Sequence, residues 1–342
     1  MKTVAIIGAG MAGLAAARAL MTNGITSVVF EKSRGLGGRA ATRRVDNCCF
    51  DHGAQYVKSP SKAIQDLIAA TGDAVLISRP IWVLTADNQI VPGDRDANEQ
   101  KWTWPTGITR LAKYLAADLV VQSATTVASL YAFDHGYRLY ATDGRDLGQF
   151  DAVILTAPAP QSAAILAAGN PPPTIRPLID SLQMVQYRRL ISITVAYPNR
   201  PAVPWYAVVN ADRQHAISWL ACEHDKPGRA PATMGLLIAQ MSDHWATTHW
   251  DSLTKGTFVP DATLPQPISE VLSAIRQLVG DLGPPQWIDV QRWRYALPYT
   301  TAPVTAAERI VLAGDLVTGQ GRVHLAIESG WRAAEQIQTL LS

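Results

Sequence analysis

The chain has 342 residues, of which 48% are hydrophobic and 17% are charged, and its formal net charge at pH 7 is +2. This composition is ordinary for a globular protein with large buried cores, and the length suggests about two domains. So small a net charge creates no field that would attract nucleic acid or an anionic membrane, and no uncharged apolar run reaches the roughly 18 residues of a membrane span. We therefore expect neither nucleic acid nor a membrane as a partner.

The N-terminal segment predicts a strand, turn, helix and strand that together bind a dinucleotide. An apolar run at residues 4–7 enters Gly-Ala-Gly-Met-Ala-Gly at 8–13, a helical stretch extends to Leu20, and a second run at 27–30 ends at Glu31. The glycines permit a tight turn and close approach of the backbone to a pyrophosphate, while the helix N-terminus favours phosphates and the acidic residue binds the adenosine ribose. The predicted cofactor contacts here are Gly8, Gly10, Met11, Ala12, Gly13 and Glu31.

A secretory signal is the alternative interpretation of this segment, because Lys2 precedes an apolar, alanine-rich stretch. Arg18 interrupts that stretch, and the glycines follow the spacing of the dinucleotide motif. Both observations favour the dinucleotide unit.

The next segment indicates which dinucleotide is bound. Residues 31–39 read Glu-Lys-Ser-Arg-Gly-Leu-Gly-Gly-Arg, which resembles the second glycine motif, E-x5-GGR, of FAD enzymes of the glutathione-reductase and amine-oxidase superfamily. The resemblance implies that Lys32, Gly38 and Arg39 contact FAD, with the Arg39 guanidinium along the pyrophosphate. The alternative is a solvated basic loop from Lys32 to Arg44.

Two later segments complete the pattern expected of an FAD domain. Residues 150–160 form an apolar strand that ends in small residues, and residues 310–315 form a strand that ends in Gly-Asp. Residues 319–323 then lead into a helix predicted over 326–341, whose start should face the flavin O2 and N1. The remaining predicted FAD contacts are Val127, Ala157, Gly314, Asp315, Arg322 and Val323.

The residues between these motifs resemble the bacterial branch of the renalase family over nearly the whole chain. The most specific marks are Asp-His-Gly-Ala-Gln-Tyr at 51–56 and Arg-Trp-Arg-Tyr-Ala-Leu-Pro at 292–298. Trp-Pro-Thr-Gly-Ile at 104–108 and Lys-Pro-Gly-Arg at 226–229 also fit. The resemblance implies a flavoenzyme that oxidises the 2- or 6-dihydro isomers of NAD(P)H to NAD(P)+ and passes the electrons to O2, giving H2O2.

Flavin chemistry of this kind places few demands on the protein side chains. Hydride transfer from a dihydronicotinamide to flavin N5 needs a flat ring held close and parallel, so aromatic walls with a few polar groups suit the pocket, and we predict no certain catalytic side chain and no metal. The predicted pocket residues are Gln55, Tyr56, Trp219, His244, Trp245, Trp293 and Tyr295, and His52, Gly53, Ala54 and Gln55 are predicted to contact FAD. A core role for Trp219 and Trp245 and a surface role for His244 remain the alternatives.

The motif positions predict an α/β fold with a discontinuous first domain. An FAD-binding Rossmann-like domain, similar to those of glutathione reductase and p-hydroxybenzoate hydroxylase, is expected over 1–56, 101–160 and 296–342. A smaller α+β substrate domain with a mixed or antiparallel sheet is expected over 57–100 and 161–295.

Cysteine usage favours a reducing, cytoplasmic location and noncovalent FAD. Cys48 and Cys49 are adjacent and cannot easily pair, and Cys222 is remote from both. Monoamine oxidases link FAD through a cysteine in their C-terminal third, and no cysteine follows Cys222 here. A histidyl link stays open from sequence, although noncovalent binding is what the resemblance implies.

Two rival functions stay open at this point. An amine or polyamine oxidase on the same fold usually has a lysine facing the flavin, and the second half of this chain offers only Lys226 and Lys255, although a lysine from the first half could serve. A flavin-binding sensor that does not turn over is the other rival. The choice between NAD and NADP forms also stays open, because any of four arginines could bind a 2'-phosphate: Arg188, Arg189, Arg229 and Arg294.

Overall fold

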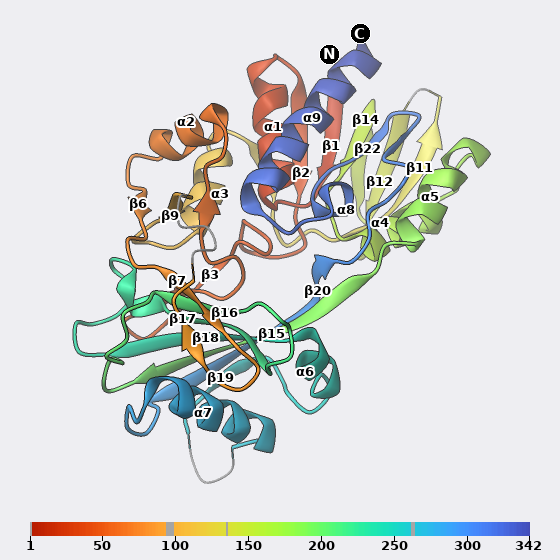
Figure 1. Cartoon of the computed structure of the whole chain (residues 1–342). Coiled ribbons are helices and arrows are strands. Elements are labelled where there is room, and N and C mark those ends of the chain that lie inside the picture. Colours follow the sequence, from red (N-terminus) through yellow and green to blue (C-terminus); the bar gives the residue numbers. More distant parts are fainter. Residues whose placement is uncertain (1, 94–98, 135, 261–263) are drawn as a thin grey trace. The chain divides into compact units, whose positions relative to one another are not determined.

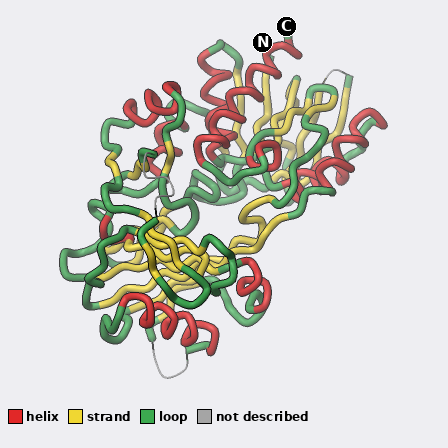
Figure 2. The backbone as a smooth tube through the Cα atoms, viewed as in Figure 1, coloured by secondary structure: helices red, strands yellow, loops and turns green. Residues whose placement is uncertain are grey.

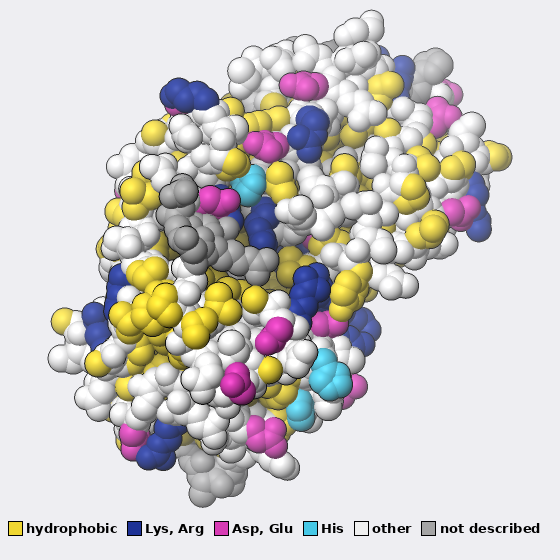
Figure 3. Space-filling model, viewed as in Figure 1, with side chains coloured by type: hydrophobic (Ala, Val, Ile, Leu, Met, Phe, Trp, Pro, Cys, Tyr) yellow, Lys and Arg dark blue, Asp and Glu magenta, His cyan; other side chains and the backbone are white. Residues whose placement is uncertain are grey.

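The computed structural model describes residues 2–93, 99–134, 136–260 and 264–342. Its backbone contacts divide the chain into two compact units (Figure 1). Unit 1 comprises Met1–Ala41, Thr109–Tyr187 and Leu297–Ser342, and unit 2 comprises Thr42–Ile108 and Arg188–Ala296. Charged side chains of both signs are scattered over the face shown in Figure 3, in keeping with the near-neutral net charge.

The boundaries of these units differ from the domain limits expected from the motifs. Residues 42–56 and 101–108 belong to unit 2, and residues 161–187 belong to unit 1. The physical reason for the second difference is that helices α4 (Ala159–Ala168) and α5 (Arg176–Gln183) bury their apolar side chains in the core of unit 1. Residues 94–98 and 261–263 of the expected substrate domain lie outside the described residues.

Unit 1 is built around a six-stranded sheet in the order β10-β2-β1-β14-β22-β21. Neighbouring strands are parallel except at the edge, where β21 is antiparallel to β22. The strands are β1 (Thr3–Ile7), β2 (Thr26–Phe30), β10 (Val120–Gln122), β14 (Ala152–Leu155), β21 (Ala306–Ala307) and β22 (Ile310–Leu312). This parallel sheet with crossover helices confirms the predicted Rossmann-like fold.

Helices cover this sheet on two sides (Figure 1). α1 (Met11–Thr22) and α9 (Val323–Leu341) pack so closely that a Cβ at Gly330 would lie 2.2 Å from the carbonyl oxygen of Ala12. On the other side, alternate strand residues share a core with α4, α5 and a three-stranded sheet. That sheet comprises β11 (Val127–Phe133), β12 (Gly136–Ala141) and β13 (Asp146–Phe150). The helix predicted over 326–341 begins three residues earlier, at Val323.

Unit 2 contains a mixed eight-stranded sheet in the order β19-β20-β15-β18-β17-β16-β7-β8. β16 and β7 are parallel, whereas β15, β18, β17 and β16 run antiparallel in turn. The strands are β7 (Ile81–Leu84), β8 (Ile90–Val91), β15 (Tyr187–Tyr197), β16 (Ala207–Asn210), β17 (Ile217–Cys222), β18 (Gly235–Met241), β19 (Gly256–Phe258) and β20 (Trp287–Pro298). The predicted mixed sheet is thereby confirmed.

Helices α6 (Asp243–Thr248) and α7 (Gln266–Val279) cover one face of this sheet (Figure 2). Alternate residues of the strands, such as Ile193 and Val195, join these helices in an apolar core. We call this the helix-covered face, and we call the opposite side the open face. The smaller elements of unit 2 are β3 (Thr42–Val45), β4 (Cys48–Asp51), β5 (Val57–Lys58), β6 (Val75–Leu76), β9 (Lys101–Thr103) and α2 (Lys62–Ala70).

Within the described residues, no helix is both long enough and apolar enough to cross a membrane. All three cysteines are free and buried, so none of them forms a disulfide within the chain.

Candidate functional site

In unit 1, the glycine turn after β1 has a shape that only glycine allows. Gly8 adopts a φ of 111°, a region that side chains disfavour, and a Cβ at Gly13 would lie 2.0 Å from the carbonyl oxygen of Gly8. By contrast, a Cβ at Gly10 would meet nothing within 4 Å. The backbone at Gly10 therefore borders open space, and the two outer glycines hold the turn in place.

This open space lies at the N-terminus of α1, where the N-cap residue makes no side-chain capping hydrogen bond. Gly10 is the N-cap and provides no side chain, and the first turn contains no acidic residue. Met11 and Ala12 continue the helix and are buried. Unpaired N–H groups and the positive end of the helix dipole suit a phosphate, so the turn fits the pyrophosphate of a dinucleotide.

Glu31, at the end of β2, is held by the backbone on both sides. Its two carboxylate oxygens accept hydrogen bonds from the N–H groups of Ala9 and Ser33, each at 2.8 Å. The carboxylate therefore fixes the first glycine turn and the start of the second. Because each carboxylate oxygen has two lone-pair directions, the predicted hydrogen bond to a ribose remains compatible with these contacts.

Replacing Glu31 by alanine should weaken FAD retention by about 1.5–3 kcal/mol, because a charge-assisted contact and the support of the Ala9 N–H are lost together. The affinity for added FAD can be measured by flavin fluorescence on the apoprotein, with Glu328→Ala on α9 as the control. An unchanged affinity in the Glu31 variant would contradict the assignment.

The second glycine motif lies against the first. The N–H of Gly37 donates to the carbonyl oxygen of Ala9 at 2.9 Å, and Gly37 and Gly38 both have positive φ, of 99° and 57°. Lys32 lies at the exposed edge, where it reaches the side chain of Gln161. These contacts bring residues 8–13 and 37–38 together, as the FAD motif requires.

Arg39 and Asp315 form a bidentate ion pair, with N···O distances of 2.5 and 2.7 Å. Burial alone would lower the pKa of the Arg39 guanidinium, but the Asp315 carboxylate outweighs it and raises that pKa above its usual value. The sequence predicts that each residue contacts FAD separately. The structure adds that they orient one another, because the bidentate geometry fixes both side chains.

The remaining predicted FAD contacts of unit 1 lie at strand and helix ends. Gly314 follows β22 with a φ of 106°, and its N–H donates to Ser329 at 2.6 Å. Arg322 is the N-cap of α9 and Val323 its first residue, and the Arg322 side chain makes no capping hydrogen bond. Ala157 follows β14, whereas Val127 belongs to the apolar core of unit 1.

In unit 2, residues 51–56 lie over the open face of the sheet. Gln240 on β18 donates to the carbonyl oxygen of Gly53 at 2.6 Å, and Trp293 on β20 donates to that of His52 at 3.0 Å. Tyr56 reaches Trp219 on β17, with ring centroids 6.1 Å apart. We call residues 51–56 the strap. It brings four of the predicted pocket residues into one layer: Gln55, Tyr56, Trp219 and Trp293.

His52 stacks on Trp293, with ring centroids 5.3 Å apart and planes inclined by 12°. Burial lowers the pKa of His52 to about 4, and the positive charges of Lys255 and Arg43 act in the same direction although Asp51 opposes them. The imidazole is therefore neutral at pH 7. A neutral ring stacked on an indole gives this part of the open face a flat, uncharged surface.

Several buried polar atoms on the open face and the strap have no hydrogen-bond partner among the described residues. They include Gln55 Oε1, Ser192 Oγ, Thr194 Oγ1, Trp219 Nε1 and Gln291 Oε1. Ser192 and Trp219 flank Gln240 in the strand register, so their side chains share its face. Buried polar atoms normally have partners, so this set of neutral donors and acceptors makes the open face a candidate binding surface.

Sequence reasoning missed Ser192, Thr194, Gln240 and Gln291. A signal was present, because Ser192 and Thr194 alternate with Ile191 and Ile193 and so lie on the opposite side of β15. Alternation alone does not tell whether a polar face meets solvent, another element or a ligand.

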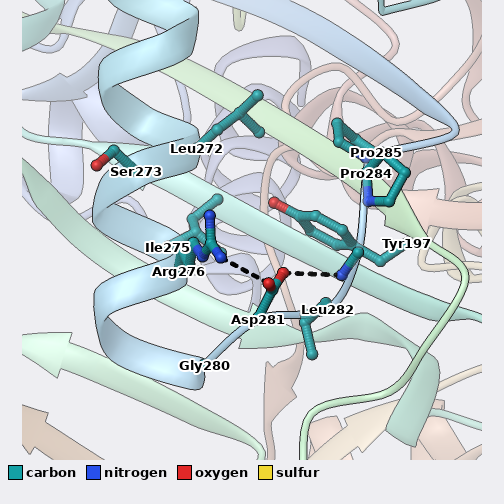
Figure 4. A pocket seen from close by; sticks show the side chains of 11 residues that line it. Tyr197, Leu272, Ser273, Ile275, Arg276, Gly280, Asp281, Leu282, Pro284 and Pro285 are labelled. Atoms are coloured by element: carbon teal, nitrogen blue, oxygen red, sulfur yellow. Dashed lines mark hydrogen bonds and ion pairs between the residues drawn. The ribbon is translucent and has the colours of Figure 1, made fainter.

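The structure does not bring Trp245 and His244 to this layer. Trp245 is 8% exposed and packs in the core of the helix-covered face, where it contacts His249. His244 precedes it on α6 and is exposed. The alternation along β20 places Tyr295 on the same side as Trp293. A pocket lined by Tyr197, Arg276, Pro284 and their neighbours lies at the C-terminal end of α7 and contains no predicted site residue (Figure 4).

Four charged side chains, one of them from the strap, form a wholly buried cluster. Asp51, Glu223, Lys226 and Arg229 have side chains that are 0% exposed. Arg229 pairs with Asp51 at 2.6 Å and with Glu223 at 3.2 Å, and Lys226 pairs with Glu223 at 2.7 Å and with Asp51 at 3.3 Å. We call these four residues the charge cluster. It commits Lys226 to two carboxylates.

Comparisons with known proteins agree with this architecture. Residues 6–71 match the family model of NAD(P)-binding Rossmann-like domains, and residues 79–338 match that of flavin containing amine oxidoreductases. The 4,4'-diapophytoene desaturase (4,4'-diaponeurosporene-forming) of Staphylococcus aureus strain Newman is 38% identical over 69 residues, which are 20% of this chain and 14% of the desaturase.

Two solved structures share the fold over nearly the whole chain. Wild-type putrescine oxidase bound to putrescine is similar with a TM-score of 0.76 and 16% identity, covering 99% of each chain. A CLA-producing fatty acid isomerase from P. acnes is similar with a TM-score of 0.70 and 13% identity, covering 99% of this chain and 98% of the isomerase. At such identities the likeness concerns the fold alone.

Proposed function

Because the chain belongs to the flavin-containing amine oxidoreductase family, we propose that it is an FAD-dependent oxidase of the renalase type. Its substrates would be 2- or 6-dihydro isomers of NAD(P)H. The balanced reaction is dihydro-NAD(P) plus O2 plus a proton giving NAD(P)+ plus H2O2. When bound, the flavin accepts two electrons and a hydrogen at N5 and passes the electrons to O2.

The residues of unit 1 would hold FAD in this proposal. The open backbone at Gly10 and the uncapped N-terminus of α1 would receive the pyrophosphate, and Glu31 would bind the ribose. Asp315, oriented by Arg39, would bind the ribityl chain or the pyrophosphate. The uncapped N-terminus of α9 would face the flavin O2 and N1, where negative charge collects on reduction.

FAD is expected to bind without a covalent link, since no cysteine follows Cys222 in the chain. Acid precipitation of the purified holoprotein should therefore release yellow flavin into the supernatant. Flavin that stays with the pellet would overturn this prediction and point to a histidyl link.

The observation that carries the choice of substrate is the chemistry of the open face. A nicotinamide is flat, and its carboxamide offers two N–H donors and one carbonyl acceptor. The unpartnered atoms Gln55 Oε1 and Trp219 Nε1 provide an acceptor and a donor of the same neutral kind. The aromatic rings of Trp293 and Tyr56 would orient the ring, and burial would exclude water.

An amine oxidase is less well supported by the same surface. Lys226, one of the two lysines of the second half of the chain, is committed to Asp51 and Glu223 in the charge cluster. It therefore has no role as a lysine that faces a flavin.

Trp293→Ala should slow substrate-dependent flavin reduction or weaken substrate binding while FAD stays bound. The variant loses the stack on His52 and the hydrogen bond to the strap, and an aromatic pair contributes about 0.5–1.5 kcal/mol beyond area burial. Tyr295→Phe keeps its ring and should have a mild effect. Stopped-flow absorbance of the flavin measures both, and a collapse by several orders of magnitude in Tyr295→Phe would mean that its hydroxyl carries chemistry.

The proposed activity can be tested directly by its products. The holoprotein is incubated aerobically with 6-dihydro-NAD, and NAD+ and H2O2 are assayed separately. One molecule of each per dihydronicotinamide consumed supports the proposal. Oxidation of putrescine but not of the dihydronicotinamide would instead support an amine oxidase, and no turnover with either would support the sensor alternative.

A further inference from the structure

Stability alone does not explain why the four charged side chains of the charge cluster are buried together. Its two carboxylates and two cations sum to zero charge, yet all four side chains are removed from water. Desolvating such ions offsets much of their mutual attraction, and well-packed apolar residues of similar volume are often as stable or more so. A network of this kind is best attested where it specifies one arrangement of the chain.

The arrangement that this cluster specifies is the position of Asp51, the first residue of the strap. Its side-chain oxygens accept from Thr42 Oγ1 at 2.7 Å and from the N–H of Ile108 at 2.9 Å, in addition to Arg229 and Lys226. Its own N–H donates to Glu223 at 3.1 Å. Both carboxylate oxygens and the backbone N–H of Asp51 therefore have hydrogen-bond partners.

The carbonyl oxygen of Asp51 connects this residue to Gln55, whose side chain belongs to the open face. It accepts a hydrogen bond from Gln55 Nε2, which also donates to the carbonyl oxygen of Gly53 at 3.2 Å. Both donors of the Gln55 amide are therefore used within the strap, and its Oε1 has no partner among the residues that the structure describes. The orientation of that oxygen depends on where Asp51 is held.

A second path leads from the cluster to the same surface. Lys226 Nζ lies 5.7 Å from the ring centroid of Tyr206, and that ring contacts Trp219 edge to face with centroids 6.2 Å apart. Burial raises the pKa of Tyr206 well above its ordinary value, with Glu223 and Asp51 adding to the effect, so the phenol stays neutral. Gln55 and Trp219 are thus both supported from the charge cluster.

We propose that Glu223 and Lys226 are positioning residues, which act on substrate oxidation through the strap without touching the substrate. This inference rests on the proposed function in one respect, that the strap and the open face bind the reacting molecule. Asp51 joins the charge cluster to the strap, and Tyr206 joins it to Trp219 on the open face. Neither residue belongs to the predicted set of substrate or FAD contacts.

The test compares a variant whose charge cluster has a net charge with a variant whose charge cluster is neutral again. Glu223→Gln keeps the size of the side chain and leaves one excess positive charge in the cluster. Glu223→Gln/Lys226→Met removes both partners and leaves the neutral pair of Asp51 and Arg229. The control is Asp281→Asn, which breaks the exposed ion pair with Arg276 in the same unit.

Two readouts are taken at a temperature at which every variant is folded. Flavin reduction by 6-dihydro-NAD should be slowed about tenfold to a hundredfold at saturating substrate in Glu223→Gln, because a shift of about 1 Å in a positioning group can have that effect. The reduction rate of the double variant should return to within about threefold of the wild-type rate, and the rate of the Asp281→Asn control should equal that of the wild type. A wild-type reduction rate in Glu223→Gln, or a double variant as slow as the single one, would overturn the proposal.

The second readout does not depend on the substrate. Amide hydrogen exchange in a peptide spanning residues 49–58 should be faster in Glu223→Gln than in the wild type, whereas a peptide spanning 187–197 should be unchanged. Equal exchange of the 49–58 peptide would overturn the inference. If the wild type fails to oxidise any dihydronicotinamide, the proposed function fails, while this readout still decides whether the cluster positions the strap.

Discussion

Asp51→Asn is expected to lower the free energy of unfolding by about 3–5 kcal/mol, because it leaves two buried cations, Lys226 and Arg229, with Glu223 as their one remaining carboxylate in the charge cluster. Asp51 accepts from four donors, and the amide nitrogen of an asparagine would face at least one of them. Urea denaturation followed by tryptophan fluorescence measures the change. The matched control is Asp281→Asn, whose exposed ion pair should contribute about 0–1 kcal/mol.

The same carboxylate predicts how stability depends on pH. Burial by itself would raise the pKa of Asp51, but Arg229 and Lys226 outweigh it and lower that pKa to about 2. The unfolded chain has an ordinary aspartate pKa of about 3.9. The stabilisation is therefore fully present above pH 4 and is lost as the pH falls toward 2.

The Asp51→Asn variant should lack this component of acid unfolding. Its urea midpoint should change less than that of the wild type between about pH 4 and pH 2. An unaltered pH dependence, or a variant as stable as the wild type at pH 7, would contradict the account of the charge cluster.

Gly13→Ala should destabilise the fold, whereas Gly10→Ala should leave the fold intact and weaken FAD binding. A Cβ at position 13 would lie 2.0 Å from a backbone oxygen, so the strand or the helix must move, and overpacking of this kind destabilises by about 1–3 kcal/mol or more. A Cβ at position 10 meets nothing within 4 Å, so the apoprotein should fold normally. That methyl group would instead occupy space where the pyrophosphate is expected to lie.

Thermal unfolding of the apoproteins and FAD titration separate the two effects. Gly13→Ala should unfold at a lower temperature than the wild type. Gly10→Ala should unfold at the same temperature as the wild type. It should bind FAD at least about tenfold more weakly, because the backbone can no longer approach the phosphates. FAD binding of wild-type strength in Gly10→Ala would place the pyrophosphate elsewhere.

The glycine turn at residues 8–13 and its contact with Glu31 could be predicted from the sequence because these residues lie close together in the chain. Gly8, Gly10 and Gly13 lie within one turn, and Glu31 follows on the next strand, so spacing alone brings them together. Four strands of the unit 1 sheet, β1, β2, β14 and β22, also follow from the apolar runs at 4–7, 27–30, 150–160 and 310–315. The parallel order of unit 1 and the mixed sheet of unit 2 match those expectations.

The open face of unit 2 could be predicted only in part, because it depends on contacts between distant segments. Asp51 meets Arg229 across 178 residues, and no periodicity in the sequence pairs them. Trp245 and Trp219 look alike in sequence, yet they lie on different faces of one sheet. Trp245 belongs to α6, which packs on the helix-covered face, whereas the register of β17 places Trp219 on the open face. Likewise, α4 and α5 join unit 1 through packing that the motifs do not encode.

The proposed oxidation of isomeric dihydronicotinamides begins with the reductive half-reaction, which can be followed separately from the reaction with O2. The FAD holoprotein is mixed anaerobically in a stopped-flow instrument with 2-dihydro-NAD(P), 6-dihydro-NAD(P), ordinary 4-dihydro-NAD(P) and putrescine, and bleaching of the flavin is followed. We predict rapid reduction by the 2- or 6-dihydro forms and reduction about 10²-fold slower by the 4-dihydro forms, since ring placement alone can give such selectivity. Equal or faster reduction by ordinary NADPH, or reduction by putrescine alone, would contradict the account.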